Sequence, residues 1–477
     1  MSTNTGRRAI LAPVPTRKLL MARDVNDTTP ITSRDALVEW LEAGIKTPDD
    51  LNVGTEHEKI PFFGASRAPV PYESPAGGIK DLLDGLGAAL GWEPITDRGA
   101  IIGLYDPHGL GAVSLEPGGQ FELSGAPLAT VHDTKAELDA HFAALEPVAR
   151  RFGISFLDLG ASPKWRRAET PAMPKQRYAI MAAYMPKVGS LGLDMMFRTA
   201  TIQVNLDFTS ETDMVDKLRV GLALQPIVTA LFANSPFIDG EPTGLLSQRS
   251  QIWRDTDAAR TGMLPFAFEP GMGFERYVDY ALDVPLYFVK RGEVYHDVAG
   301  ASFRDLMDGR LAALPGERAT MSDWANHLGA IFPEARLKRY LEMRGADGGP
   351  RSHMAALPAL FVGLFYDQTA LDGALALIEG WSAEDREALR AEVPRLALET
   401  RIRGRRALDI ARDMLALARG GLSRRAKRDA RGRDETIYLA PLEEIAESGR
   451  TLAERRLEAY RGRWGRSVDP AFEDCAL

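Results

Sequence analysis

Cysteine is nearly absent from this 477-residue chain, whose only cysteine is Cys475. One thiol cannot form an intrachain disulfide or a thiolate metal centre, and so low a count is typical of proteins made in a reducing compartment. Long hydrophobic runs are also missing. The best candidate, 354–366, is shorter than the ~18 residues that a membrane span needs and is interrupted by Pro358 and Gly363. We therefore expect neither a disulfide framework nor a membrane protein.

The common nucleotide and zinc motifs are missing as well. The sequence contains no G-x-x-x-x-G-K-[ST], no G-x-G-x-x-G and no H-E-x-x-H. A nucleotide bound by this protein is therefore not held by a P-loop or by a dinucleotide-binding fold.

Charge is distributed unevenly along the chain. The net charge is −8, but residues 401–433 contain twelve Arg or Lys and three Asp, so that the remainder of the chain carries −17. Within this basic stretch, Leu408, Met414, Leu415 and Leu417 predict an amphipathic helix with a solvated basic face. Because the stretch has no aromatic residue to stack on bases, we do not expect nucleic acid as a partner.

The distribution of helical and strand patterns predicts an α+β fold. Strands interleave with helices without the regular repeat of a parallel doubly wound sheet. Residues 1–24 are expected to be a disordered N-terminal arm, and 25–477 a single catalytic body with a mostly helical C-terminal third. A capping box at 32–35 is expected to open a helix. Further helices are predicted at 79–90, 133–151, 176–185, 211–231, 322–328, 383–391, 405–418 and 441–461.

The segment 53–59 places two carboxylates on one strand face. Period-two alternation puts Glu56 and Glu58 on one side and His57 on the other, which we expect to face the core. Two carboxylates about 7 Å apart repel by about 2.4 kcal/mol at an effective dielectric near 20. A shared buried face would therefore require a cation between them, whereas a solvated sheet edge would not.

Three more segments carry polar residues opposite an apolar strand face. In 114–124 the Pro-Gly-Gly turn predicts a hairpin that brings Glu116 beside Gln120 and Glu122. In 200–208, polar positions alternate with Ile, Val, Leu and Phe, and in 339–347 Glu342 and Arg344 share one side. Taken singly, 200–208 is equally compatible with a half-exposed strand, and 339–347 is compatible with a surface ion pair between Glu342 and Arg344. Together, the four segments favour a carboxylate-lined sheet that binds a hard divalent cation such as Mg²⁺.

These segments also resemble a known family. The strings Gly54-Thr-Glu-His-Glu-Lys59, 114–127, 185–194, 201–208, 221–236 and 340–349 are similar to the plant and proteobacterial branch of glutamate-cysteine ligase, over nearly the whole chain. The resemblance implies a glutamine synthetase-like fold, in which a curved, mostly antiparallel sheet forms a bowl-shaped ATP and metal site surrounded by helices. It also implies ATP-dependent ligation of the γ-carboxyl of L-glutamate to the amine of L-cysteine through a γ-glutamyl phosphate.

Roles follow from the resemblance motif by motif. Arg344 and Glu58 would be catalytic, with Arg344 contacting the phosphates of ATP. Glutamate would be bound by Arg177, Arg249 and Asn205, since an arginine fork suits a carboxylate. The Mg²⁺ ligands would be Glu56, Glu58, Glu116, Glu122, Gln203 and Glu342. Trp165 and Trp253 are candidates for lining the pocket or for the core.

The missing cysteines bear on regulation and location. Plant members of the family use cysteine pairs for redox control, which a chain with only Cys475 cannot reproduce. We therefore expect a cytoplasmic enzyme, a monomer or homodimer, whose partners are small-molecule substrates. Two alternatives stay open: a γ-glutamyl ligase acting on a different amine acceptor, and a catalytically silent homologue that acts as a binding module.

Overall fold

The computed structural model describes residues 27–109 and 111–477, and its centre is an open sheet of nine strands. The strand order is β14-β15-β7-β1-β5-β4-β3-β2, with β6 also paired to β1, and the registers of this sheet are antiparallel. The predicted α+β class with a mostly antiparallel sheet is confirmed. The strands are β1 (Val53–Phe63), β2 (Glu93–Asp97), β3 (Ala100–Tyr105), β4 (Ala112–Leu115), β5 (Phe121–Ser124), β6 (Ile154–Leu157), β7 (Thr201–Leu206), β14 (Ala335–Leu337) and β15 (Leu341–Asp347).

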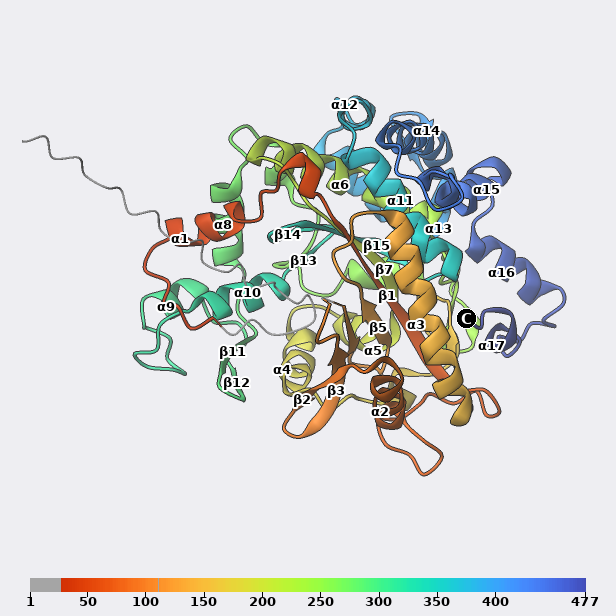
Figure 1. The fold of residues 1–477 in the computed structure, drawn as a ribbon, viewed down its shortest axis with the longest axis horizontal. Coiled ribbons are helices and arrows are strands. Elements are labelled where there is room, and N and C mark those ends of the chain that lie inside the picture. Colours follow the sequence, from red (N-terminus) through yellow and green to blue (C-terminus); the bar gives the residue numbers. More distant parts are fainter. Residues whose placement is uncertain (1–26, 110) are drawn as a thin grey trace, which may run out of the picture.

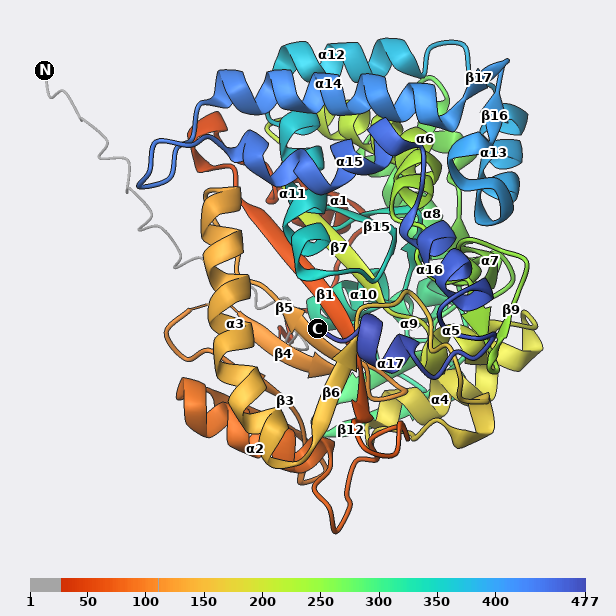
Figure 2. The same ribbon diagram turned by 90° about the vertical axis from the view of Figure 1, so that its right-hand side faces the viewer.

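Helices surround this sheet (Figures 1 and 2). They are α1 (Asp35–Glu42), α2 (Ile79–Leu90), α3 (Val131–Arg151), α4 (Gln176–Tyr184), α5 (Gly192–Arg198), α6 (Glu211–Leu231), α7 (Gln248–Trp253), α8 (Phe274–Asp283), α9 (Phe303–Met307), α10 (Met321–Gly329), α11 (Arg351–Phe365), α12 (Gln368–Leu377), α13 (Ala383–Leu396), α14 (Ala407–Arg425), α15 (Ala440–Ser448), α16 (Leu452–Arg461) and α17 (Ala471–Asp474). Short hairpins include β11 (Phe288–Arg291) with β12 (Val294–Asp297), and β16 (Arg401–Ile402) with β17 (Arg405–Arg406). Apart from the latter hairpin, the elements from Arg351 onward are helical.

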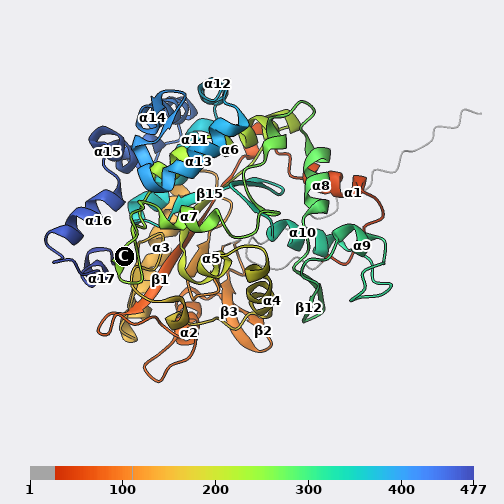
Figure 3. The ribbon, with the colours of Figure 1, turned by 180° about the vertical axis from the view of Figure 1, so that it is seen from behind.

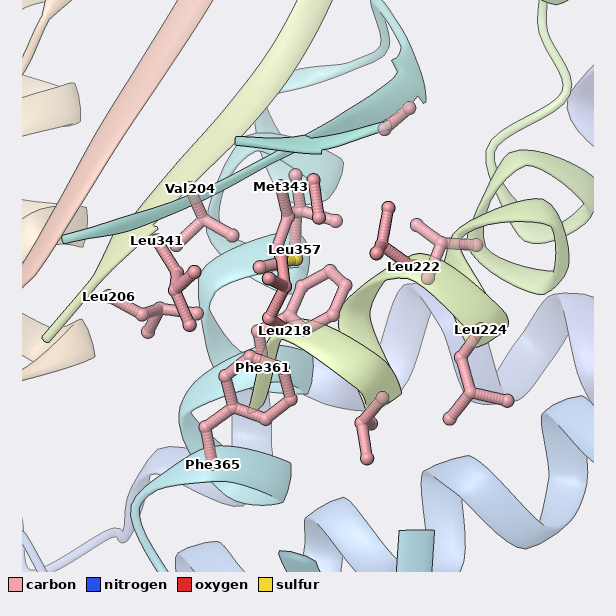
Figure 4. Packing of buried hydrophobic residues seen from close by; sticks show 14 of the residues in the cluster. Val204, Leu206, Leu218, Leu222, Leu224, Leu341, Met343, Leu357, Phe361 and Phe365 are labelled. Atoms are coloured by element: carbon pink, nitrogen blue, oxygen red, sulfur yellow. The ribbon is translucent and has the colours of Figure 1, made fainter. Parts of the chain in front are cut away.

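The apolar face of the sheet packs on α6 and α11. Alternate residues of β7 and β15, such as Val204 and Met343, point toward Leu222 of α6 and Phe361 of α11, and all four are buried (Figure 4). Helices α12 and α14 form a further layer outside α11 and α6, as Figure 2 shows from the side. Since period two sends neighbouring residues to opposite faces, this core leaves the polar set of each strand on the other side of the sheet.

The C-terminus closes the far end of β1. Figure 3 shows α16 and α17 beside the sheet, where Tyr460 and Phe472 join a small buried cluster with Phe62. Cys475 lies in this cluster, fully buried. Burial raises the pKa of its thiol to about 12, so the group is a protonated, apolar filler. Trp165 belongs to the same cluster, which makes it a core residue.

Most predicted helices are present with small differences in their bounds, but two predictions were wrong. The segment 441–461 is not one helix, because α15 ends at Gly449 in a left-handed conformation (φ 65°) and a capping box at Thr451 starts α16. At the N-terminus, α1 begins after Arg34 with no side-chain cap, so 32–35 is not a capping box. The predicted arm at 1–24 lies outside the described residues.

The basic stretch and the most apolar segment both fold as helices. In α14, Leu408, Met414 and Leu415 are buried, as the amphipathic pattern predicts, and arginines of its exposed side pair with carboxylates, for example Arg424 with Asp367 at 2.7 Å. The apolar segment forms α11. In the described chain no single helix has the length and composition to cross a membrane, and α11 with α12 passes that test only as a pair bent by 94°.

We predict that Gly421→Ala destabilises the protein, because α14 and α11 touch backbone to backbone there. A Cβ at residue 421 would lie 1.9 Å from the carbonyl oxygen of Gly363. Overpacking of this kind costs about 1–3 kcal/mol, measurable as a lower melting temperature. The control is Gly420→Ala, whose Cβ would meet only the flexible end of Arg424 at 3.2 Å and which gains up to about 1 kcal/mol of helix propensity. Equal melting temperatures for the two variants would contradict this packing.

Candidate active site

The strand register gathers the predicted polar residues on one face of the sheet. Residues directly opposite each other in antiparallel strands point to the same side. The pairs in register are Glu56 with Gln203 and with Ser124, Glu58 with Glu122, Glu122 with Ser114, Asn205 with Glu342, and Glu342 with Arg336. Residues more than 280 positions apart in sequence thus share one surface. Glu116 joins them from the turn between β4 and β5, where its N–H donates to the carbonyl oxygen of Gln120.

This polar face forms the floor of a cavity of about 280 Å³. Residues of strands β1, β4, β5, β7, β14 and β15 and of helices α4, α5, α7 and α10 line it. Because residues from strands across most of the sheet line one cavity, the polar face is concave. Of the predicted site residues, those lining the cavity are Glu56, Glu58, Glu116, Glu122, Arg177, Gln203, Arg249 and Arg344. Glu342 and Asn205 share this face of the sheet through the strand register but do not line the cavity.

Glu56 is the centre of the glutamate group. Its Oε1 accepts a hydrogen bond from the amide of Asn205 at 2.8 Å, and its Oε2 accepts one from the amide of Gln203 at 3.2 Å. Burial, together with the charges of Glu342 and Glu122, raises the pKa of Glu56 to about 8. The half-exposed strand considered for 200–208 is excluded, because every residue of β7 is buried.

Glu58 and Glu122 face each other across β1 and β5. The Oε2 of Glu58 accepts from the N–H of Thr201 at 3.1 Å, and Glu122 accepts from the Ser114 hydroxyl. Burial and the neighbouring carboxylates, above all Glu116, raise the pKa of both groups. The solvated sheet edge considered for Glu56 and Glu58 is therefore excluded, since these carboxylates repel each other inside the protein.

Glu342, in contrast to these carboxylates, is surrounded by positive charge. It is 0% exposed, and its carboxylate accepts hydrogen bonds from Arg336 at 2.7 Å and from Arg344, with Lys338 at 3.3 Å. Burial alone would raise its pKa, but these three cations hold the pKa of Glu342 well below its usual range. A surface ion pair between Glu342 and Arg344 is thus excluded. The guanidinium of Arg344 also donates to the Gln203 amide oxygen at 2.8 Å.

The two arginines predicted to clamp a carboxylate lie in the first turns of two short helices. Arg177 is the second residue of α4, with its guanidinium 5.5 Å from the ring centre of Tyr178. Arg249 is the second residue of α7, and its Nη2 donates to the carbonyl oxygen of Arg344 at 2.8 Å. The Nε of Arg249 is buried without a hydrogen-bond partner. Both line the cavity, and so does Trp253.

Sequence reasoning missed Arg336 and Lys338, the main counter-charges of the site. They stand at alternate positions at the end of β14 and both line the cavity. Their spacing, two cations followed by Glu342 and Arg344 at the same period, was a readable signal. His57 is 2% exposed and stacks on Phe142 of α3 on the opposite face, which confirms that it faces the core.

The donor set suits a divalent cation. Burial and acidic neighbours raise the pKa values of Glu56, Glu58 and Glu122, and a cation placed among these carboxylates would relieve their repulsion. Within residues 27–109 and 111–477, however, no three His, Cys, Asp or Glu side chains already stand as a metal cage. The six metal ligands therefore stay predictions. If Gln203 or Glu342 were a metal ligand, the ligand atom would be an oxygen that now accepts a hydrogen bond from an arginine.

The site is thus an open antiparallel sheet that presents acidic and basic groups to one cavity. Comparison with known proteins identifies the family. The model of glutamate-cysteine ligase family 2 matches residues 52–474, and the chain belongs to this family. The chloroplastic glutamate-cysteine ligase of Nicotiana tabacum is 52% identical over 470 residues, covering 98% of this chain and 87% of the relative. That of Arabidopsis thaliana is 51% identical over 465 residues, covering 98% and 86%.

The fold is also found in a solved structure. The crystal structure of glutamate-cysteine ligase from Francisella tularensis in complex with AMP superposes with a TM-score of 0.50 at 13% identity, covering 88% of this chain and 86% of that one. At this identity the likeness shows the shared fold alone.

The expected cytoplasmic location was wrong. The relatives at about half identity are chloroplastic proteins. The expectation rested on the single cysteine and the missing redox pairs of the plant members, and a low cysteine count indicates reducing conditions without distinguishing one reducing compartment from another.

We predict that Glu342→Gln destabilises the protein by about 3–5 kcal/mol, because removal of one partner leaves Arg336, Lys338 and Arg344 as buried, uncompensated charges. Urea unfolding followed by circular dichroism measures this loss. The matched control is Glu146→Gln, which breaks an ion pair of two half-exposed side chains with Arg351 and should cost no more than about 1 kcal/mol. A Glu342→Gln variant as stable as the control would show that the buried cluster does not hold β14 and β15 together.

Proposed function

We propose that this protein ligates the γ-carboxyl of L-glutamate to the amine of L-cysteine at the expense of ATP, the first step of glutathione biosynthesis. The observation that carries the proposal is the cavity in which a group of carboxylates faces a group of arginines across one sheet. Family membership over residues 52–474 supports it independently. A catalytically silent binding module would have no need to keep these carboxylates, so their presence argues against that alternative.

The acidic half of the cavity provides the place for the divalent cation. Glu56, Glu58, Glu116 and Glu122 would hold Mg²⁺, which supplies neutralisation of the β- and γ-phosphates of the nucleotide. Arg344 reaches the same floor from β15 and donates hydrogen bonds to the moving phosphoryl group. Its planar fork is held by Glu342 and Gln203, so it is oriented before substrate arrives.

The basic walls of the cavity provide the place for the amino acid. Arg177 and Arg249 project from two different helices and bind the α-carboxylate of glutamate. Asn205 keeps a more indirect role, because its amide donates to Glu56 beneath the cavity surface.

The direct test is product formation. Purified protein is incubated with ATP, Mg²⁺ and glutamate, and ADP release is compared between cysteine, 2-aminobutyrate and other amines, with the products identified by mass spectrometry. We expect γ-glutamylcysteine and a preference for cysteine. Preference for another amine would assign the chain to a different γ-glutamyl ligase. Absence of any glutamate-dependent ADP release would contradict the proposal altogether.

We predict that Arg344→Lys lowers kcat by about 10² to 10³, because lysine keeps the charge but loses the planar fork that meets the transferring phosphoryl group. The measurement is steady-state ADP release together with the melting temperature. The matched control is Arg339→Lys, which also lies beside the cavity but packs on Trp40 with its guanidinium 4.4 Å from that ring. If Arg344→Lys melts normally and turns over at close to the parent rate, the assignment of the phosphate site is wrong.

A further inference from the structure

Asp347, the last residue of β15, is a fully buried carboxylate for which the reaction has no direct use. Its Oδ2 accepts hydrogen bonds from the N–H of Asn234 at 2.9 Å and from the Ser235 hydroxyl at 2.6 Å, and its Oδ1 accepts one from the Ser247 hydroxyl at 2.8 Å. All three donors belong to the connection between α6 and α7. The end of the strand that carries Arg344 is therefore tied to the loop that leads into α7.

The same two serines also hold the first turn of α7. Ser247 is the N-cap residue, and its hydroxyl oxygen accepts from the N–H of Ser250 at 3.1 Å. The hydroxyl oxygen of Ser235 accepts from the N–H of Arg249 at 3.1 Å. Each hydroxyl thus donates to Asp347 and accepts from α7. A helix of six residues does not hold itself in place, so its orientation depends on these anchors.

Arg249 is prepared for a ligand by this arrangement. Asp347 accepts its three hydrogen bonds from the loop. Burial lowers the pKa of Arg249, and the nearby negative charge of Asp347 opposes that lowering. One guanidinium nitrogen is fixed by the carbonyl oxygen of Arg344, and Nε is buried without a partner. The backbone also makes room for the carboxylate, since a Cβ at Gly160 would lie 2.5 Å from the Cβ of Asp347.

We propose that Asp347 is a positioning residue for substrate binding: through Ser235 and Ser247 it sets the orientation of Arg249. The inference rests on the proposed function in one respect, that Arg249 binds the α-carboxylate of glutamate. Asp347 does not touch substrate. It acts on the amino-acid half of the cavity and not on the nucleotide half.

The test is Asp347→Asn in the full chain. Asparagine keeps the size and can still accept from the Asn234 N–H, but it loses the charge and the second acceptor oxygen. We expect the KM for glutamate to rise about tenfold, the scale of losing one charged hydrogen bond, with kcat within about threefold and the KM for ATP unchanged. An unchanged KM for glutamate, or equal rises in both KM values, would overturn the proposal.

Asp158→Asn is the matched control. Asp158 is another buried carboxylate, paired with Arg456 at 2.7 Å in the adjoining hydrogen-bond network, and it makes no contact with α7. Its loss should lower the melting temperature and leave the KM for glutamate unchanged. If Asp347→Asn does not fold, Ser235→Ala takes its place, because it removes only the bridge to the Arg249 N–H. That variant should raise the same KM severalfold, and no change in it would overturn the proposal.

A double variant and a binding measurement separate this inference from the proposed function. In an Arg249→Lys background, Asp347→Asn should change the KM for glutamate by less than twofold, since both changes remove one interaction. Full additivity would contradict positioning through Arg249. Calorimetric titration of the parent protein with glutamate, without cysteine, tests the shared premise. If the parent protein releases ADP and binds glutamate, and Asp347→Asn has the same KM for glutamate as the parent, only the positioning role is refuted. A parent that does not bind glutamate refutes both.

Discussion

Electrostatic repulsion among buried carboxylates is the constraint on which this structure depends. Glu56, Glu58 and Glu122 share one concave face, and each has its pKa raised by burial and by its acidic neighbours. Such an arrangement lowers stability unless other interactions offset it. The offset comes from the opposite side of the same sheet, where alternate residues of β7 and β15 pack against α6 and α11 in the main hydrophobic core. The sheet therefore carries an unfavourable polar face because its other face is buried.

Strands β14 and β15, at one end of the sheet, supply the positive charge. The register of β15 against β7 is regular through Met343 and shifts before Ala346, so Arg344 lies where the regular ladder ends. Its guanidinium reaches Gln203 on β7 as well as Glu342 on its own strand. A regular strand would place residues 342 and 344 about 7 Å apart, side by side. Because Glu342 pairs with Asn205 and Met343 with Val204, the same register places Arg344 opposite Gln203, so one arginine contacts both its own strand and β7 at the floor of the cavity.

The sequence predicted the acidic face well, because period-two alternation is a local property that survives folding. The Pro-Gly-Gly turn was equally local, and Gly119 adopts the expected positive φ of 86°. What could not be read locally was pairing. Whether Glu342 faces a metal or an arginine depends on which strand lies beside it. The alternation of Arg336 and Lys338 with Glu342 and Arg344 is readable in the sequence, but it does not show that β14 folds back onto β15. Gly449 and Thr451 signal the break between α15 and α16, but the apolar pattern continues across them and led to the prediction of one helix.

The distribution of charge within the cavity explains how one site can take ligands of both signs. At the β14–β15 edge, Arg336, Lys338 and Arg344 share a single carboxylate, so this end keeps an excess of positive charge. At the β1–β5 end, Glu56, Glu58, Glu116 and Glu122 face the same space with an excess of negative charge. A polyphosphate alone would be repelled by the second group, and a free cation by the first. In the proposed reaction, a nucleotide carrying its divalent cation would match both groups, with its phosphates toward the arginines and its cation toward the glutamates. Such complementarity would favour the metal–nucleotide complex over either component, which ties the order of charges along the sheet to the reaction proposed for it.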